Sequence, residues 1–254
     1  MFQGINSLIK SCYDAGMSQT VYQSIVYFTF FVQFIFLFFY RKKCGISLKE
    51  TILTVVIIYP FLYFWMLVVT WAELGFKNWG SNNIVRMYVW VPLVVFFFAK
   101  LLTLPSKTLD DFLAPSMALQ QTVGHTVCPF AGCCNGYPCE WGIYNPVSEQ
   151  CLFPNQWLEC LVSLVILIVL LKYADHEGHK GSGKVFSMFM ILFGSTRFLL
   201  EFLRDNEKVF FGISELAVHA ALLALVGVYW LIDINEREKK KAKAAGIPKR
   251  AKAR

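Results

Sequence analysis

Three long stretches of this 254-residue chain carry no charged side chain, and that absence limits the folds open to it more than any other feature. The uncharged stretches are residues 15–40, 51–72 and 112–139. Each is long enough to cross the hydrocarbon core of a bilayer, about 30 Å thick, which needs roughly 20 apolar residues in a helix. Charged residues make up only 16% of the chain, against about 25% in soluble domains. The sequence therefore predicts an all-α integral membrane protein.

Four further apolar segments complete a prediction of seven transmembrane helices. The expected spans are 19–40, 51–72, 84–104, 111–133, 156–173, 184–204 and 215–232. Because no internal repeat or flexible linker separates these segments, we expect residues 1–236 to form a single membrane domain. We expect a basic cytoplasmic tail, residues 237–254, to follow it.

The net charge of +7 is concentrated in that tail, which holds nine Lys or Arg residues and one Glu. The rest of the chain is nearly neutral, so no nucleic-acid partner is expected. Basic residues in short loops mark the cytoplasmic side, and eighteen of the 24 Lys and Arg residues fall on the side of the tail. We therefore expect the amino terminus outside and the carboxyl terminus in the cytoplasm. The tail either lies on anionic headgroups or is a solvated segment that sets topology.

Five polar residues stand out in the apolar body. Arg197, Glu201 and Arg204 are spaced by four and three residues, which places them on one face of a helix. Buried charge is costly and usually functional, so the two arginines suit a lipid phosphate, unless Arg197 and Glu201 only neutralise each other. Glu159 is a further candidate, unless it reaches water from the membrane surface. His125 is expected in the middle of the fourth span, either as a hydrogen-bonded core residue or lining a cavity as a base or phosphate donor.

Five of the eight cysteines lie between Cys128 and Cys151. Four of these are expected in the outer compartment, where disulfides form: Cys133, Cys134, Cys139 and Cys151. Three pairings are possible, and the adjacent cysteines are expected to bond to the other two rather than to each other. No C-x-x-C motif is present, and His176 and His179 fall on the cytoplasmic side, so we expect no metal site.

Three blocks of this sequence resemble the bacterial prolipoprotein diacylglyceryl transferases. Asp111-Phe-Leu-Ala-Pro115, running into Gly124, is similar to the approach to the family's Gly-Arg-x-Gly-Asn-Phe signature. Pro154-x-Gln156-x-x-Glu159 is similar to its Pro-x-Gln-Leu-Tyr-Glu, and Arg197-Phe-Leu-Leu-Glu201-Phe-Leu-Arg204 to its Arg-Phe-x-x-Glu-x-x-Arg. Ala131-Gly-Cys-Cys-Asn-Gly136 resembles a variant signature, Ala-Gly-Cys-Cys-x-Gly, of divergent relatives.

The resemblance implies an enzyme of the bacterial cytoplasmic membrane whose active site faces the outer leaflet. It implies transfer of a diacylglyceryl group from phosphatidylglycerol to the cysteine thiol of a lipoprotein precursor, with no cofactor. His125 takes the place of the family's signature arginine, and the third span lacks its His-Gly-Gly. The expected catalytic residues are His125, Glu159, Arg197 and Glu201, and the expected lipid- or phosphate-binding residues are Arg197, Arg204, Gln156, Asn135 and Gly136.

Three other functions fit the sequence less well. A paralogue would move a glyceryl or phosphoglyceryl group to a different acceptor. A non-catalytic protein would bind phospholipid through the same arginines. A thiol–disulfide oxidoreductase would use the outer cysteines, although membrane oxidoreductases of that kind favour C-x-x-C.

Overall fold

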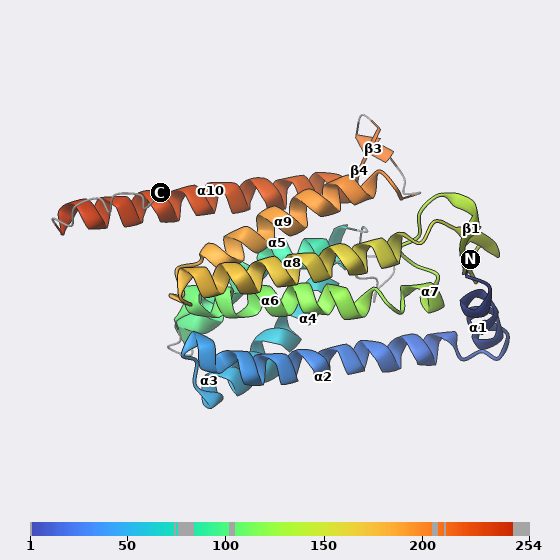
Figure 1. Cartoon of the computed structure of the whole chain (residues 1–254), viewed down its shortest axis with the longest axis horizontal. Helices are drawn as coiled ribbons and strands as arrows, with labels where there is room; N and C mark the ends of the chain where they lie inside the picture. The colour runs from blue at the N-terminus through green and yellow to red at the C-terminus, as the bar shows by residue number, and fades with distance from the viewer. Residues whose placement is uncertain are drawn as a thin grey trace.

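The computed structural model describes residues 2–73, 75, 84–101, 105–204, 208–210 and 212–245. Long helices run side by side along one axis. The helices Gln3–Asp14 and Cys128–Ala131 and the labelled strands lie at one end of them, and the short helix Leu48–Leu53 lies at the other end (Figure 1). The described helices are α1 (Gln3–Asp14), α2 (Ser18–Cys44), α3 (Leu48–Leu53), the π-helical turn η1 (Thr54–Ile58), α4 (Tyr59–Glu73), α5 (Ile84–Leu101), α6 (Ser106–Gly124), α7 (Cys128–Ala131), α8 (Asn155–Glu177), α9 (Lys184–Glu201) and α10 (Glu215–Ala244). The strands are β1 (Pro138–Asn145), β2 (Gln150–Leu152), β3 (Lys208–Phe210) and β4 (Ile213–Ser214).

Four helices in the described part of the chain are long and apolar enough to cross a membrane. They are Ser18–Cys44, Leu48–Ala72, Asn155–Glu177 and Glu215–Ala244. Large apolar side chains point outward from them; Phe28, Phe39 and Leu161 are 55%, 63% and 58% exposed. A water-facing surface would not tolerate so many contiguous apolar groups, whereas lipid does. The chain is therefore a helical membrane protein.

The helical segment from Leu48 to Glu73 contains a π-helical turn. At its start, Ser47 and Glu50 form a capping box, in which the Glu50 N–H donates to the Ser47 hydroxyl at 3.2 Å and the Ser47 N–H donates to the Glu50 carboxylate at 2.6 Å. The wide turn η1 lies just before Pro60. Because proline has no N–H to donate to the residue four positions earlier, one α-helical bond is lost at this point.

α6 lies at the centre of the bundle, in contact with α2, α5, α8 and α9. The side chains of Leu109, Phe112, Leu113 and Met117 are fully buried in that centre. The helices α9 and α10 pack closely because glycines face the neighbouring helix. A Cβ atom at Gly194 would lie 2.6 Å from the backbone oxygen of Ala220, closer than any side chain allows.

α6 ends earlier than the sequence predicts. The expected span 111–133 is wrong at its carboxyl end, because the helix runs from Ser106 to Gly124 and a short turn leads into α7. Pro129 explains the break, since in a continuing helix its missing N–H and its ring would face the carbonyl of His125. The prediction that His125 lies in the middle of a helix is therefore wrong; it follows the last turn.

The all-α prediction also omits two small sheets, β1 paired with β2 and β3 paired with β4, both antiparallel. At the other end of the chain, α10 continues to Ala244, so the predicted tail begins as helix. Residues 246–254 of that tail and residues 102–104 of the third predicted span lie outside the described residues.

Candidate functional site

Glu159 is the hub of a buried ion-pair network between α8 and α9. Its Oε1 accepts hydrogen bonds from Arg197 Nη1 at 2.6 Å, from Arg204 Nη2 at 2.6 Å and from Arg204 Nε at 3.0 Å. The Asn155 amide, one turn earlier on α8, donates to the same oxygen at 3.1 Å. Glu159 is only 4% exposed, so the alternative in which it reaches water from the membrane surface is wrong.

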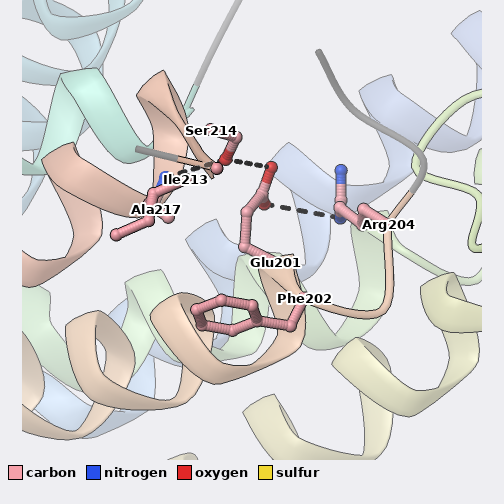
Figure 2. Close-up of a pocket in the computed structure, with 7 residues that line it drawn as sticks. Glu201, Phe202, Arg204, Ile213, Ser214 and Ala217 are labelled. Atoms are coloured by element: carbon pink, nitrogen blue, oxygen red, sulfur yellow. Dashed lines mark hydrogen bonds and ion pairs between the residues drawn. The ribbon is translucent and has the colours of Figure 1, made fainter. Parts of the chain in front are cut away.

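Glu201 links the two arginines to α10. Its Oε2 lies 2.9 Å from Arg197 Nη2 and 3.9 Å from Arg204 Nε. Figure 2 shows the Glu201 carboxylate between Arg204 and Ser214, whose hydroxyl donates to Oε1 at 2.9 Å. The Ser214 hydroxyl also accepts the Ala217 N–H and so caps α10. The prediction of one helical face is confirmed for Arg197 and Glu201 and wrong for Arg204, because α9 ends at Glu201 and Arg204 follows it in a backbone bridge.

The network balances two guanidiniums against two carboxylates. None of the four side chains belongs to a residue more than 7% exposed: Arg197, Arg204, Glu159 and Glu201. An unpaired charge at such a position costs several kcal/mol, and here each charge is compensated by a partner of opposite sign. Asn155 and Ser214, which complete the network, were not singled out from the sequence, although a serine directly before Glu215 is a typical helix N-cap.

His125 joins this network from the end of α6. Its Nε2 lies 3.0 Å from Glu159 Oε2 and 2.9 Å from Gln121 Oε1. The Gln121 amide in turn donates to the Tyr88 hydroxyl at 2.8 Å. A hydrogen-bonded chain therefore runs from α5 through α6 to the arginines. The sequence shows Gln121 and Tyr88 only as polar residues in apolar helices, and their separation along the chain conceals the contact.

Three cysteines lie beside His125. The Cys128 Sγ is 3.6 Å from His125 Nδ1, and the Cys133 thiol donates to the Cys128 carbonyl at 3.8 Å. Hydrogen bonds from the Cys128 and Cys133 thiols, helped by the nearby Arg204 charge, hold the pKa of Cys134 well below its ordinary value. The absence of a nearby histidine was the reason to expect no metal site, and that reason is wrong, because His125 lies among these thiols.

All eight cysteines fall in the described part of the chain, and none of them forms a disulfide. The expected disulfides of Cys133 and Cys134 with Cys139 and Cys151 are therefore not supported. Cys139 and Cys151 lie on the strands β1 and β2, whereas Cys133 and Cys134 lie in the turn that follows α7. That turn points the adjacent thiols back toward Cys128, a consequence of folding that chain spacing alone does not reveal.

The other expected lipid-binding residues shape the same turn. The Gln156 amide donates to the Cys133 carbonyl at 3.0 Å and to Asn135 Oδ1 at 2.6 Å. Gly136 forms a backbone bridge with Arg204, and a Cβ atom there would lie 2.8 Å from the Leu203 carbonyl oxygen. Glycine is thus required at this position for the turn to pack against the segment that carries Arg204.

A cavity of about 690 Å³ opens between α2 and the η1–α4 segment. Its walls are mostly apolar and aromatic, and they include Tyr22, Val26, Phe30, Gln33, Tyr59 and Tyr63. The end of the cavity at Tyr22 lies near the cysteine-bearing turn, because α2 packs against α7. The cavity therefore extends from the cysteine-bearing turn along the length of α2 toward Leu37.

Apolar helices around a buried, neutral cluster of arginines and carboxylates define an integral membrane protein with a polar site inside its bundle. The chain belongs to the prolipoprotein diacylglyceryl transferase family, whose model matches residues 51–233. Membership in this family and the four apolar helices indicate a multi-pass protein of the bacterial inner membrane.

Individual relatives carry the same family name. The chain is 30% identical over 140 residues to phosphatidylglycerol–prolipoprotein diacylglyceryl transferase 2 of Clostridium perfringens, covering 52% of this chain and 54% of the relative. It is 33% identical over 106 residues to the transferase of Clostridium tetani, covering 39% and 41%, and 30% identical over 140 residues to that of Bordetella avium, covering 54% and 53%. The chain thus spans about half the length of the curated relatives it matches.

Proposed function

We propose that this protein transfers a diacylglyceryl group from phosphatidylglycerol to the cysteine thiol of a lipoprotein precursor. The observation that carries the proposal is the buried network of Arg197, Arg204, Glu159 and Glu201 in a bundle that also holds an apolar, lipid-sized cavity. The relatives' names state the same substrates. The reaction needs a cationic site for the departing phosphate and a way to activate the thiol.

In this proposal, Arg197 and Arg204 bind the phosphate of the lipid. A guanidinium has five N–H donors in a planar fork that suits phosphate oxygens. The contacts with Glu159 and Glu201 engage only Nη1 and Nη2 of Arg197 and Nε and Nη2 of Arg204. The two carboxylates therefore orient the arginines and leave donor capacity for the substrate.

His125, Gln156, Asn135 and Gly136 have supporting roles in the same proposal. His125 serves the acceptor thiol, since it lies between Glu159 and the cysteine-bearing turn. Gln156 and Asn135 hydrogen-bond each other at the edge of the network and offer their remaining polar groups to the glycerol headgroup. Gly136 lets that turn approach Arg204.

The acyl chains would occupy the cavity between α2 and α4. Its volume of about 690 Å³ and its aromatic walls suit hydrocarbon, and pockets for small molecules are typically 300–1,000 Å³. On its wall, the Gln33 amide donates to the Ser116 carbonyl at 3.0 Å. Tyr22 lies where the chains would meet the headgroup.

We also propose seven spans, an outward amino terminus, and an active site toward the outer leaflet. The support is the gathering of basic residues at the end of the bundle remote from the turn that carries Cys128, Cys133 and Cys134. Lys43 pairs with Asp175 at 3.0 Å, and Lys184 pairs with Glu238 at 2.7 Å on α10. Residues 1–236 would form one membrane domain, and residues 237–254 a basic cytoplasmic extension.

The test is transfer of labelled diacylglycerol from phosphatidylglycerol vesicles to a cysteinyl lipoprotein-precursor peptide by the purified full chain. Arg197→Ala should reduce transfer by at least about 100-fold, as loss of a preorganised charge donor does in other enzymes. Arg237→Ala, in an exposed pair with Asp233, is the matched control and should retain full rate. Full transfer by Arg197→Ala would refute the phosphate site, and failure to rescue a transferase-deficient strain would refute the reaction.

A further inference from the structure

The turn after α6 brings three soft ligand atoms together. His125, Cys128 and Cys134 each place one nitrogen or sulfur within 4.8 Å of the others. The backbone is bent to do so: Gly132 has a φ of 65° and Cys134 a φ of 62°, a left-handed conformation that a non-glycine residue seldom adopts. A residue in such a backbone conformation persists only where the surrounding structure enforces it, and such residues cluster at functional sites.

A second feature of this cluster lies on the far side of the histidine ring. His125 Nε2 is 3.0 Å from the buried Glu159 carboxylate, and Nδ1 faces the Cys128 sulfur at 3.6 Å. In the neutral ring, an N–H on Nε2 that donates to this carboxylate leaves Nδ1 as the acceptor directed at the Cys128 sulfur. Metal-ligating histidines are almost always oriented in this way by a carboxylate, carbonyl or water.

We propose that His125, Cys128 and Cys134 bind a zinc ion. The fourth position of the metal takes the thiol of the acceptor cysteine, and this second claim rests on the proposed function. Two thiolates and one imidazole with an open position are a donor set found in catalytic zinc sites. Zinc–sulfur bonds of about 2.3 Å in a tetrahedron place the sulfurs roughly 3.8 Å apart. The ligand atoms, all within 4.8 Å of one another, need only small side-chain movements to reach this geometry.

Zinc coordination would supply the nucleophile for the transfer. A coordinated thiol is deprotonated, and its proton passes to solvent. The zinc-held acceptor sulfur then attacks the glyceryl carbon that bears the phosphate: a sulfur–carbon bond forms, the carbon–oxygen bond breaks, and its electron pair leaves on glycerol phosphate. A zinc ion with two thiolates and a neutral imidazole carries no net charge, so the incoming thiolate adds one negative charge near Arg204, which also interacts with Cys134.

In this arrangement, the Glu159 carboxylate would position both the nucleophile and the leaving group. Its Oε1 accepts from the arginines that would bind the leaving phosphate, and its Oε2 pairs with His125. The nucleophile and the leaving group would thus be positioned from opposite oxygens of one carboxylate. Cys133 lies next to these ligands but not within the same short distance of all of them, so it is not a member of the set.

The experiment is titration of the reduced, chelator-treated full chain in detergent with Co²⁺, in the absence of lipid and peptide. We expect one equivalent to bind, with thiolate charge-transfer absorption in the near ultraviolet and the visible bands of tetrahedral cobalt. Cys128→Ser, Cys134→Ser and His125→Ala should each abolish this spectrum, and Cys160→Ser on α8, outside the cluster, should leave it unchanged. Equal binding by the wild type and Cys128→Ser, or no binding by the wild type, overturns the site.

Two further measurements address the open position. Adding a cysteinyl acceptor peptide should increase the charge-transfer absorption, whereas the same peptide with serine in place of cysteine should not. Cys133→Ser should retain both responses; if it loses the cobalt spectrum, a fourth protein thiol closes the site and acceptor coordination is overturned. Glu159→Gln should weaken cobalt binding about 10- to 100-fold, as loss of an outer-sphere partner does.

Failure of this inference and failure of the proposed function give different results. A chain that transfers diacylglycerol at full rate after metal removal, and binds no cobalt, keeps its function and has no metal site. A chain that binds cobalt and the cysteinyl peptide but transfers nothing from phosphatidylglycerol has the site and a different reaction.

Discussion

Replacing Glu159 with glutamine removes one negative charge from the centre of the buried network while keeping the shape of the side chain. Arg197 and Arg204 both contact the oxygen Oε1, and His125 contacts Oε2. After the change, two buried guanidiniums share the single carboxylate of Glu201. Removing one partner of a buried ion pair costs about 3–5 kcal/mol of folding free energy, because the remaining charge is left uncompensated.

For a chain of this size, each kcal/mol lowers the melting temperature by about 2–4 °C. Glu159→Gln should therefore melt about 6–20 °C below the wild type, measured by thermal unfolding of the full chain in detergent. Asp175→Asn is the matched control, because it makes the same substitution on the same helix at an exposed pair with Lys43. That control should melt at the wild-type temperature.

A double variant separates charge balance from function. Glu159→Gln combined with Arg204→Gln leaves one arginine and one glutamate, so the buried network is neutral again. More than half of the lost melting temperature should return, while transfer activity should stay lost because both groups serve the substrate. A single variant that melts within 2 °C of the wild type, or a double variant that melts lower still, would refute the reasoning from buried charge.

Three other predictions concern packing, the cavity and topology. Gly194→Leu should abolish recovery of folded protein in detergent size-exclusion chromatography, because its side chain would enter the backbone of α10, whereas Gly4→Ala, which meets no atom within 4 Å, should not. Val26→Trp should fill the cavity and raise the KM for phosphatidylglycerol with melting temperature unchanged, and an unaltered KM would place the acyl chains elsewhere. In a chain otherwise free of reactive thiols, Glu149→Cys should label with an impermeant maleimide in intact cells and Lys43→Cys only after permeabilisation; the reverse pattern would invert the proposed topology.

The sequence is most informative where charge is scarce. Arg197, Glu201 and Arg204 stand out because the apolar helices carry so few ionisable groups. Helical spacing correctly pairs Arg197 with Glu201, whereas Arg204 lies beyond the end of α9 and reaches Glu201 from the turn that follows. Glu159 also stands out, although which atoms it binds depends on how α8 packs against α9. Pairing within a helix follows from spacing, whereas pairing between helices requires the fold.

Two errors in prediction share one cause, the turn after α6. The absence of charge in residues 112–139 predicts that the helix continues through this turn, although Pro129 prevents that continuation. The disulfide prediction followed from the expected compartment, whereas the fold turns Cys133 and Cys134 toward Cys128 and away from Cys139 and Cys151. Composition and compartment predict only the average properties of a segment. The positive φ angles of Gly132 and Cys134, which shape this turn, depend instead on local packing.

The π-helical turn Thr54–Ile58 has a consequence for how this chain can change in length. A π turn holds one more residue than the α-helical turn it replaces, so deleting any one of these five residues would restore a regular helix. The side chains before and after the deletion would keep the faces that they have now, because the π turn already accommodates the extra residue. Tyr59 and Tyr63 would stay on the cavity wall. Here the chain can lose a single codon and keep the shape of the cavity, whereas the same loss within a regular helix would rotate every following side chain by about 100° around the helix axis.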